Sequence, residues 1–246
     1  MTLKKMTVSV LALLVGFCMT PNANADYHSM NANFEYIVVS AGLNPSNQED
    51  RNLIQSALEK TAEESGESYE AIVERVAYES QNAKPDQEML AGGNVQAYHV
   101  ALRAPRYVGD VFYSSNSTFG IQHGHTGIYD SSFSYVEATS PHIRRVNAYW
   151  AEAPAPAFKY YVGWDRQSPN KYKAANFAAA QVGKGYNWFF WNNKTIYAST
   201  YNCSQLVWAA YKQTDPKVDL DSNGGAGVYP LDIKNSSWLH EYQRIG

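Results

Sequence analysis

Residues 201–211 read YNCSQLVWAAY and have the pattern of an amphipathic helix that begins at a cysteine. The apolar residues that repeat at helical spacing after the cysteine are Leu206, Val207, Ala210 and Tyr211. Asn202 or Thr200 can cap the start of this helix. The dipole and free N–H groups of a helix N-terminus stabilise a thiolate, the nucleophilic form of cysteine. Cys203 is therefore our candidate nucleophile, and it should point toward the layer on which the helix packs.

The N-terminal residues have the features of a secretory signal peptide. Lys4 and Lys5 precede an apolar run over residues 6–17, and the Ala-Asn-Ala sequence that ends at Ala25 is a small-x-small cleavage signal. We expect residues 1–25 to be removed and the remaining chain to be secreted, periplasmic or associated with the cell wall. No later apolar run is long enough to cross a bilayer, so we expect no stable membrane insertion.

The cysteine count indicates that Cys203 forms no disulfide within the exported chain. The chain has two cysteines, and the other, Cys18, lies inside the predicted signal peptide. Phe17 precedes Cys18 where lipid attachment requires a small residue, so we do not expect a lipoprotein. The exported chain would keep one cysteine in a compartment where cysteines are usually paired. A chain of this size can build a core without disulfides, so the fold does not need this thiol.

The composition argues against a nucleic-acid partner. The formal net charge is −3 for the whole chain, and it becomes more negative once Lys4 and Lys5 are removed. Binding to nucleic acid or to an anionic membrane surface calls for a basic excess or patch. No motif in the sequence predicts a cofactor.

Residues 26–96 predict an N-terminal helical region. After a short polar leader, Ser46 and Glu49 have the spacing of a capping box, and apolar residues then repeat at helical spacing. The pattern breaks at Gly66, resumes, and ends near Pro85. This predicts a helical hairpin, which could be an accessory domain, a prosegment or a lid.

Residues 97–246 form the second predicted domain, which is rich in Tyr, Gly and β-branched residues. Strands are predicted over residues 108–113, 124–129 and 135–138, and a helix over residues 171–182, before Gly183. The Ala-Pro repeat at residues 153–156 is predicted to be a surface loop. Helices followed by a strand-rich domain predict an α+β protein.

A cysteine nucleophile needs a nearby base, and the base usually needs an orienting partner. His125 is our candidate base and Glu137 its partner, because both lie on the predicted hairpin of residues 124–138. Any register with an even residue sum, such as 129 opposite 135 or 128 opposite 134, places both side chains on one face. A slip by one residue would separate them.

Each of these residues also has an ordinary structural explanation. Cys203 could be an inert buried hydrophobe, and Glu137 could be a solvent-facing strand residue. His123, His125 and His142 could be packing or loop residues, and His123 with His125 could chelate zinc from one strand face. The sequence lacks the paired cysteines or histidine-rich second half that would complete a four-ligand set, so we predict no metal site.

Five motifs together resemble a known superfamily. In chain order they are GDVFYSS (109–115), GHTGIYD (124–130), YVEAT (135–139), GKGYNWFF (183–190) and YNCSQLVWAAY (201–211). They resemble the circularly permuted branch of the NlpC-type papain-like superfamily, especially the YiiX/YebB-like cysteine hydrolases, whose relatives include lecithin:retinol acyltransferase. In that branch the histidine precedes the cysteine, as it does here. The resemblance covers about residues 107–238, including the late VYPLDI segment, and nothing before about residue 96 matches.

The resemblance implies a permuted papain-like fold, with a small antiparallel barrel-like sheet and the cysteine helix packed across it. It implies that Cys203 is the nucleophile, His125 the general base and Glu137 the residue that orients the base. The backbone N–H of Cys203, at a helix N-terminus, is a further candidate as oxyanion donor. The implied reaction is acyl transfer through a thioester.

The substrate is less determined by these motifs. An amide or peptide bond in bacterial cell-wall peptides is the first expectation, and a lipid ester or amide is the alternative, because the permuted branch includes acyltransferases. Tyr201, Trp188 and Tyr113 are our candidate substrate-binding residues, although large aromatic residues more often serve burial. A protein of another class is also possible: a cell-wall or lipid-binding module that keeps the fold without turnover.

Overall fold

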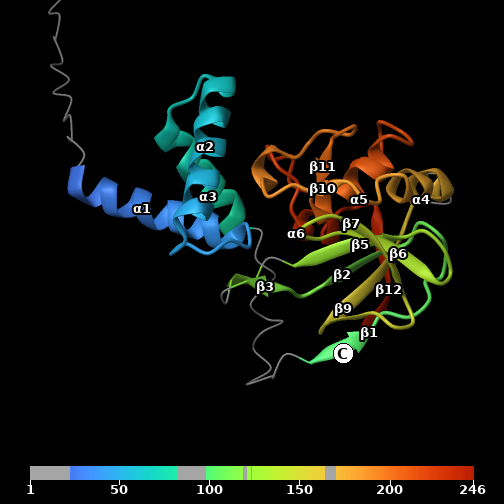
Figure 1. The fold of residues 1–246 in the computed structure, drawn as a ribbon. Helices are drawn as coiled ribbons and strands as arrows, with labels where there is room; N and C mark the ends of the chain where they lie inside the picture. The colour runs from blue at the N-terminus through green and yellow to red at the C-terminus, as the bar shows by residue number, and fades with distance from the viewer. Residues whose placement is uncertain (1–22, 83–97, 119–120, 123, 164–169) are drawn as a thin grey trace, which may run out of the picture.

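The computed structural model describes residues 23–82, 98–118, 121–122, 124–163 and 170–246. Three N-terminal helices are followed by a six-stranded antiparallel sheet and by the helices that pack on it (Figure 1). The predicted α+β class is confirmed at this level. The predicted domain boundary at residue 97 lies outside the described residues.

The N-terminal helices are α1 (Ala23–Ser40), α2 (Gln48–Ser65) and α3 (Tyr69–Asn82). Their apolar faces meet in a core of their own, in which Ile37, Ile54 and Ile72 are fully buried. The prediction of a polar leader before the hairpin was wrong, because the segment up to Ser40 forms α1. The apolar residues near the end of this segment, including Ile37 and Val38, gain burial only when α2 and α3 are present to receive them.

The cap of α2 differs from the prediction by one residue. Asn47, and not Ser46, is the N-cap, and its side-chain oxygen accepts a hydrogen bond from the backbone N–H of Glu49 at 2.8 Å. Asn and Ser are comparable N-cap residues, so the sequence alone favours neither of these neighbours. The helix ends as predicted at Gly66, whose φ of 72° is the left-handed conformation common after helices. The predicted end of the hairpin at Pro85 lies outside the described residues.

The sheet has the strand order β12 (Leu239–Ile245), β9 (Ala157–Val162), β2 (Val111–Ser114), β5 (His125–Tyr129), β6 (Ser134–Ala138) and β7 (Ile143–Asn147). Every neighbouring pair is antiparallel. Shorter pairs in the described residues are β1 (His99–Ala101) with β8 (Glu152–Pro154), β10 (Gly185–Tyr186) with β11 (Thr200–Tyr201), and β3 (Ser117–Thr118) with β4 (Ile121–Gln122).

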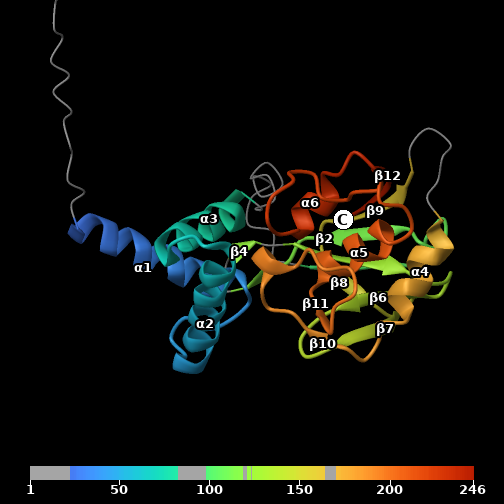
Figure 2. The same cartoon turned by 90° about the horizontal axis from the view of Figure 1, so that it is seen from above.

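The cysteine helix α5 (Cys203–Lys212) lies against one face of this sheet, beside α4 (Lys171–Ala179) and α6 (Pro230–Lys234) (Figures 1 and 2). Successive strand residues point to opposite faces. Val111, Ile128 and Val136 therefore share the core with α5. Alternate residues of the same strands, among them Phe112, Tyr129 and Tyr135, form a second core. The predicted packing of the cysteine helix on the sheet is thus present in the structure.

Other predicted elements differ at their ends. The predicted strand over residues 108–113 begins later, at Val111, and the predicted helix over residues 171–182 ends at Ala179. The prediction of a loop at residues 153–156 was only partly right, because β8 continues through Pro154, Ala155 and Pro156 form the connection, and β9 begins at Ala157. Proline is tolerated here because β8 pairs with β1 alone and does not need every backbone N–H in a ladder.

We predict that Asn202→Ala lowers the free energy of unfolding by about 1 to 2 kcal/mol, the usual cost of losing an N-cap. The side-chain oxygen of Asn202 accepts from the backbone N–H of Gln205 at 3.0 Å, and its loss would leave that buried donor without its acceptor. Urea unfolding followed by circular dichroism measures the change. Asn47→Ala removes the exposed cap of α2 and is the matched control. A smaller cost at Asn202 than at Asn47 would contradict this account of α5.

Candidate active site

Cys203 is held at the first turn of α5 by a buried polar network. Asn202 caps the helix, and Asn193 donates from Nδ2 to the Asn202 side-chain oxygen at 3.2 Å and to the Val228 carbonyl at 2.7 Å. Ser204 also donates to the Val228 carbonyl, at 2.6 Å. Because these donors and acceptors are buried, each would be costly to leave unpaired, and together they fix the start of the helix.

The thiol side chain lies in an aromatic environment. Cys203 is 3% exposed and packs with Phe190 and Tyr229. The rings of Phe190 and Tyr229 are stacked, with centroids 5.8 Å apart and an interplanar angle of 17°. Cys203 is a free cysteine in the structure. The nucleophile candidate is therefore screened from bulk water and fixed in position by rigid neighbours.

His125 and Glu137 are brought together by the hairpin of β5 and β6. Tyr129 pairs with Tyr135, so the register is one of those that place His125 and Glu137 on the same face. His125 Nε2 lies 2.7 Å from Glu137 Oε2. The same His125 ring lies close enough to Cys203 for the two side chains to interact. Because Glu137 occupies Nε2, Nδ1 is the ring nitrogen that remains for the thiol.

The charge state of His125 follows from these neighbours. Burial alone would lower the pKa of His125, but hydrogen bonds and charge interactions with Cys203 and Glu137 outweigh it and raise the pKa to about 10. The imidazole is therefore protonated near neutral pH. Burial also acts to raise the pKa of Glu137, but the hydrogen bond and charge of His125, together with Arg144, lower it. Glu137 is accordingly ionised, and it orients a positively charged ring.

Arg144 completes the surroundings of Glu137. It lies on β7 directly opposite Glu137, and its Nε donates to Glu137 Oε1 at 2.7 Å. The two oxygens of the carboxylate are thus used by different partners, Oε1 by Arg144 and Oε2 by His125. Ion pairs to a buried carboxylate offset the cost of removing it from water. Arg144 was not identified from the sequence, because its role depends on the pairing of β6 with β7.

A cavity of about 370 Å³ opens onto Cys203, His125 and Glu137. Its other charged lining residues are Arg144 and Glu152, and its aromatic lining includes Phe112, Tyr135, Tyr186, Trp188 and Phe190. Neutral polar residues that line it are Ser40, Ser114, Asn116, Thr139 and Ser140. The hydroxyl of Ser114 is buried and has no hydrogen-bond partner among the described residues, so a bound molecule could supply one. The cavity joins the catalytic candidates to a mixed polar and aromatic surface.

The three predicted substrate-binding residues occupy different places. Trp188 lines the cavity, where its ring lies edge-on to that of Tyr186 with centroids 4.9 Å apart. Tyr201 is fully buried, and its hydroxyl donates to the Ile196 carbonyl at 2.7 Å. Tyr113 is also fully buried and does not line the cavity in the described residues.

Tyr186 was missed by the sequence reasoning. It lines the cavity, and burial together with the neighbouring Cys203 raises the pKa of its phenol. The hydroxyl therefore stays protonated and remains a hydrogen-bond donor. The only signal was its place in the GKGYNWFF motif, four residues before Phe190.

The alternative of a zinc site formed by His123 and His125 falls partly outside the described residues, because His123 is not among them. Its proposed partner His125 is engaged by Glu137. His142 is an exposed residue whose backbone forms a bridge with Gly185. Among the described residues, no group of three or more His, Cys, Asp or Glu side chains is arranged to hold a metal ion.

Comparisons with known proteins show a similarity over about half of the chain. No family model matches the chain, and no solved structure matches it. The chain is 36% identical over 134 residues to the uncharacterized protein YycO of Bacillus subtilis (strain 168). The match covers 53% of this chain and 53% of that protein, so the chain spans about half the length of the curated relative it matches.

We predict a pH-dependent contribution of His125 to stability. Its pKa in the folded protein is raised above the ordinary 6.5 to about 10. The stabilisation is therefore complete below pH 6.5 and is lost as the pH rises through about 10. Glu137 stays ionised across this window, so it adds no slope. The difference in free energy of unfolding between the wild type and His125→Gln, measured in urea, should shrink across the window. A difference independent of pH would contradict the charged assignment.

Proposed function

We propose that this protein is a thiol hydrolase that cleaves an amide or peptide bond through a thioester intermediate. The observation that carries the proposal is the arrangement of Cys203 at the start of α5, beside His125, whose Nε2 lies 2.7 Å from Glu137 Oε2. A nucleophile, a base and a group that orients the base are the minimum set for covalent acyl transfer by cysteine. All three contribute to the wall of a single cavity.

The fold that we propose for this domain is the circularly permuted, NlpC-type papain-like fold of the YiiX/YebB-like branch. Support comes from the chain order, in which the histidine strand precedes the cysteine helix, and from the packing of that helix on an antiparallel sheet. We propose the barrel-like closure of this sheet on the same resemblance.

The reaction would begin with attack of the Cys203 thiolate on the substrate carbonyl carbon, which forms the C–S bond. The backbone N–H of Cys203 would stabilise the oxyanion. As the C–N bond breaks, the His125 imidazolium gives its proton to the leaving amine. Neutral His125 then takes a proton from water as the water oxygen attacks the thioester, which releases the acid and regenerates the thiolate and imidazolium.

The lining of the cavity supports a peptide as the first substrate class. Ser114, Asn116 and Ser140 offer hydroxyl and amide groups, and Arg144 and Glu152 offer charges of both signs. These groups suit the N–H, C=O and charged ends of a short peptide, whereas an acyl chain would leave the buried Ser114 hydroxyl without a partner. Together with the proposed export of the chain, this favours peptides of the bacterial cell wall.

A lipid ester or amide is the second candidate substrate, for hydrolysis or acyl transfer. The observation that favours it is the aromatic part of the cavity wall, in which Phe112, Trp188 and Phe190 present apolar surface. Such a surface could hold an acyl chain. Incubation with peptidoglycan fragments and with lipid amides and esters, followed by mass spectrometry, separates the two classes by their products.

The proposed location is outside the cytoplasm, in the secreted, periplasmic or cell-wall fraction. It rests on the signal-like residues 1–25, most of which lie outside the described residues. In the described part of the chain, no helix combines the length and apolar character needed to cross a bilayer.

We predict that Cys203→Ala abolishes hydrolysis while the circular dichroism spectrum and the unfolding midpoint stay close to those of the wild type. The alanine removes the sulfur nucleophile and deletes little volume from the packing beside Phe190 and Tyr229. Cys203→Ser keeps a hydroxyl of similar size and should retain only a trace of activity, because serine is far less nucleophilic than a thiolate. Full activity in Cys203→Ala would contradict the mechanism.

Rapid labelling of Cys203 by iodoacetamide near neutral pH separates the hydrolase from a non-catalytic binding module.

We predict that Arg144→Gln slows both this labelling and hydrolysis, because Glu137 loses the partner of Oε1 and holds His125 less firmly. Arg145→Gln is the matched control, since Arg145 is the next residue on β7 and pairs with Asp130 instead. Equal effects of the two substitutions would contradict a positioning role for Arg144.

A further inference from the structure

The turn between α1 and α2 contributes to the wall of the active-site cavity. Ser40, Ala41 and Gly42, which we call the α1–α2 corner, line the same cavity as Cys203 and His125. The corner is 161 residues or more from Cys203 in sequence, so the contact exists only because the helices dock on the sheet domain. The N-terminal helices therefore meet the candidate site directly.

The corner has a rigid backbone. The N–H of Gly42 donates to the Val39 carbonyl at 2.9 Å, and the N–H of Leu43 donates to the Val38 carbonyl at 3.1 Å. Gly42 adopts a φ of 84°. These features make a Schellman motif, in which the chain leaves the helix in one defined direction. The corner is thus a fixed surface rather than a loose connection.

The helices are attached next to the nucleophile by the aromatic run of residues 187–191. Trp191 is buried in the core of the N-terminal helices, and Trp188 and Phe189 pack against that core. Phe190, between them in the chain, packs on Cys203 instead. One short segment therefore contacts the helical core with some side chains and the thiol with another.

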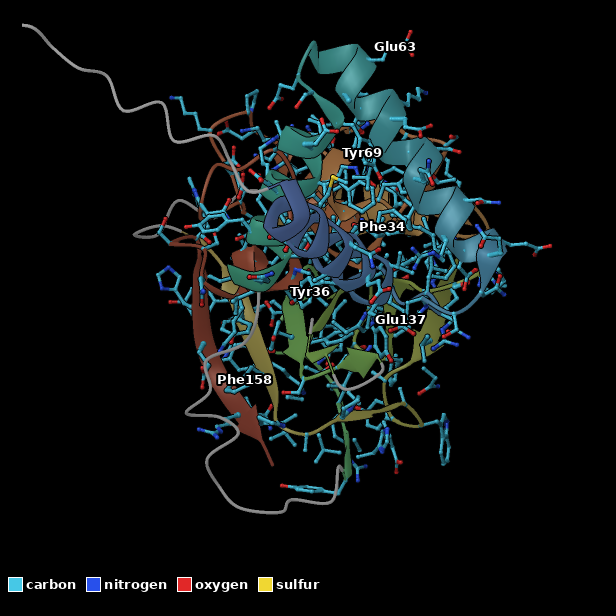
Figure 3. All side chains as sticks on the ribbon, turned by 90° about the vertical axis from the view of Figure 1, so that its left-hand side faces the viewer. Phe34, Tyr36, Glu63, Tyr69, Glu137 and Phe158 are labelled. Carbon is cyan, nitrogen blue, oxygen red and sulfur yellow. The ribbon has the colours of Figure 1, made fainter. Side chains whose placement is uncertain are left out.

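A second attachment comes from α3. Ser80 Oγ lies 3.4 Å from the hydroxyl of Tyr229, whose ring stacks on Phe190 beside Cys203. Glu79 Oε1 accepts from the backbone N–H of Ala226 at 3.4 Å. Figure 3 looks from the side of the helices and shows α1, with Phe34 and Tyr36 labelled, in front of the sheet that carries Glu137.

We propose that the N-terminal helices are a permanent wall of the substrate site and that the α1–α2 corner determines which substrates reach Cys203. The proposal rests on the proposed hydrolase function. An inhibitory prosegment would fill the space before the thiol, whereas here the corner borders an open cavity of about 370 Å³. Ser40, Ala41 and Gly42 are among the smallest residues, so they leave room for a substrate group beside them.

The corner also indicates the chemistry of that group. In the described residues, no backbone N–H donates to the carbonyls of Ser40, Ala41 or Gly42. Carbonyls at the C-terminal end of a helix carry partial negative charge and accept hydrogen bonds readily. A substrate with amide N–H or ammonium donors could hydrogen-bond to any of these carbonyls that faces the cavity, whereas a lipid acyl chain could not. The wall therefore favours peptide substrates.

Ser40→Phe tests the wall without needing a known substrate. The partly exposed Ser40 can accept a larger side chain, which would project into or across the cavity. Cys203 is labelled with iodoacetamide, N-ethylmaleimide and N-(1-pyrenyl)maleimide, and peptide mapping separates it from Cys18. Ser46→Phe is the matched control, because Ser46 is an exposed serine of the same connection and does not line the cavity.

For each variant, the labelling rate of the largest reagent that reacts with the wild type is divided by the labelling rate of iodoacetamide. We expect Ser40→Phe to lower this ratio about tenfold, which corresponds to about 1.4 kcal/mol in the activation barrier. Ser46→Phe should leave this ratio unchanged. An unchanged ratio in folded Ser40→Phe would overturn the wall and leave the hydrolase proposal intact. Slow iodoacetamide labelling of the wild type would instead count against the hydrolase. Ser40→Gln, which adds less volume, should give an intermediate ratio and serves if the phenylalanine variant does not fold.

Discussion

The buried carboxylate of Glu137 is the group on which the candidate site depends. Its side chain is about 5% exposed, and a buried charge is costly unless it is paired and hydrogen-bonded. His125 and Arg144 each satisfy one carboxylate oxygen, and both are cationic, so the charge is offset. The three residues come from β5, β6 and β7. The register of these strands therefore decides whether both cations reach the carboxylate. A slip of either pairing would remove one of the two partners of this buried carboxylate.

The nucleophile depends on a separate set of interactions. Cys203 is placed by the cap of α5, and α5 is placed by apolar packing on the sheet face that carries Val111, Ile128 and Val136. Apolar packing sets the distance between helix and sheet, and the polar network around Asn202 sets where the helix begins. The meeting of thiol and imidazole thus requires two independent parts of the fold to agree in position. Such agreement is the preorganisation that acyl transfer by cysteine needs.

Local signals explain what the sequence could predict. Asn202 and the apolar spacing after Cys203 predict the helix from a dozen residues. His125 and Glu137 are an even number of residues apart, so a hairpin whose paired residue numbers have an even sum places them on one face. Arg144 could not be found in this way, because it requires the pairing of β6 with β7 and not merely the presence of a strand. The α1–α2 corner was beyond reach for a stronger reason. Its position depends on how the helices dock on the sheet, and no repeating pattern of residue types in the sequence predicts that docking.

The aromatic run of residues 187–191 couples the helical wall to the nucleophile. Neighbouring side chains along a chain point in different directions, so a run of large residues can pack on two partners at once. Trp191 is anchored in the core of the helices while Phe190 packs on Cys203 and stacks on Tyr229. A shift of the helices would therefore move the backbone that holds Phe190 and, with it, the surroundings of the thiol. Because packed interiors transmit displacement rather than absorb it, the shape of the cavity and the position of its nucleophile are set together.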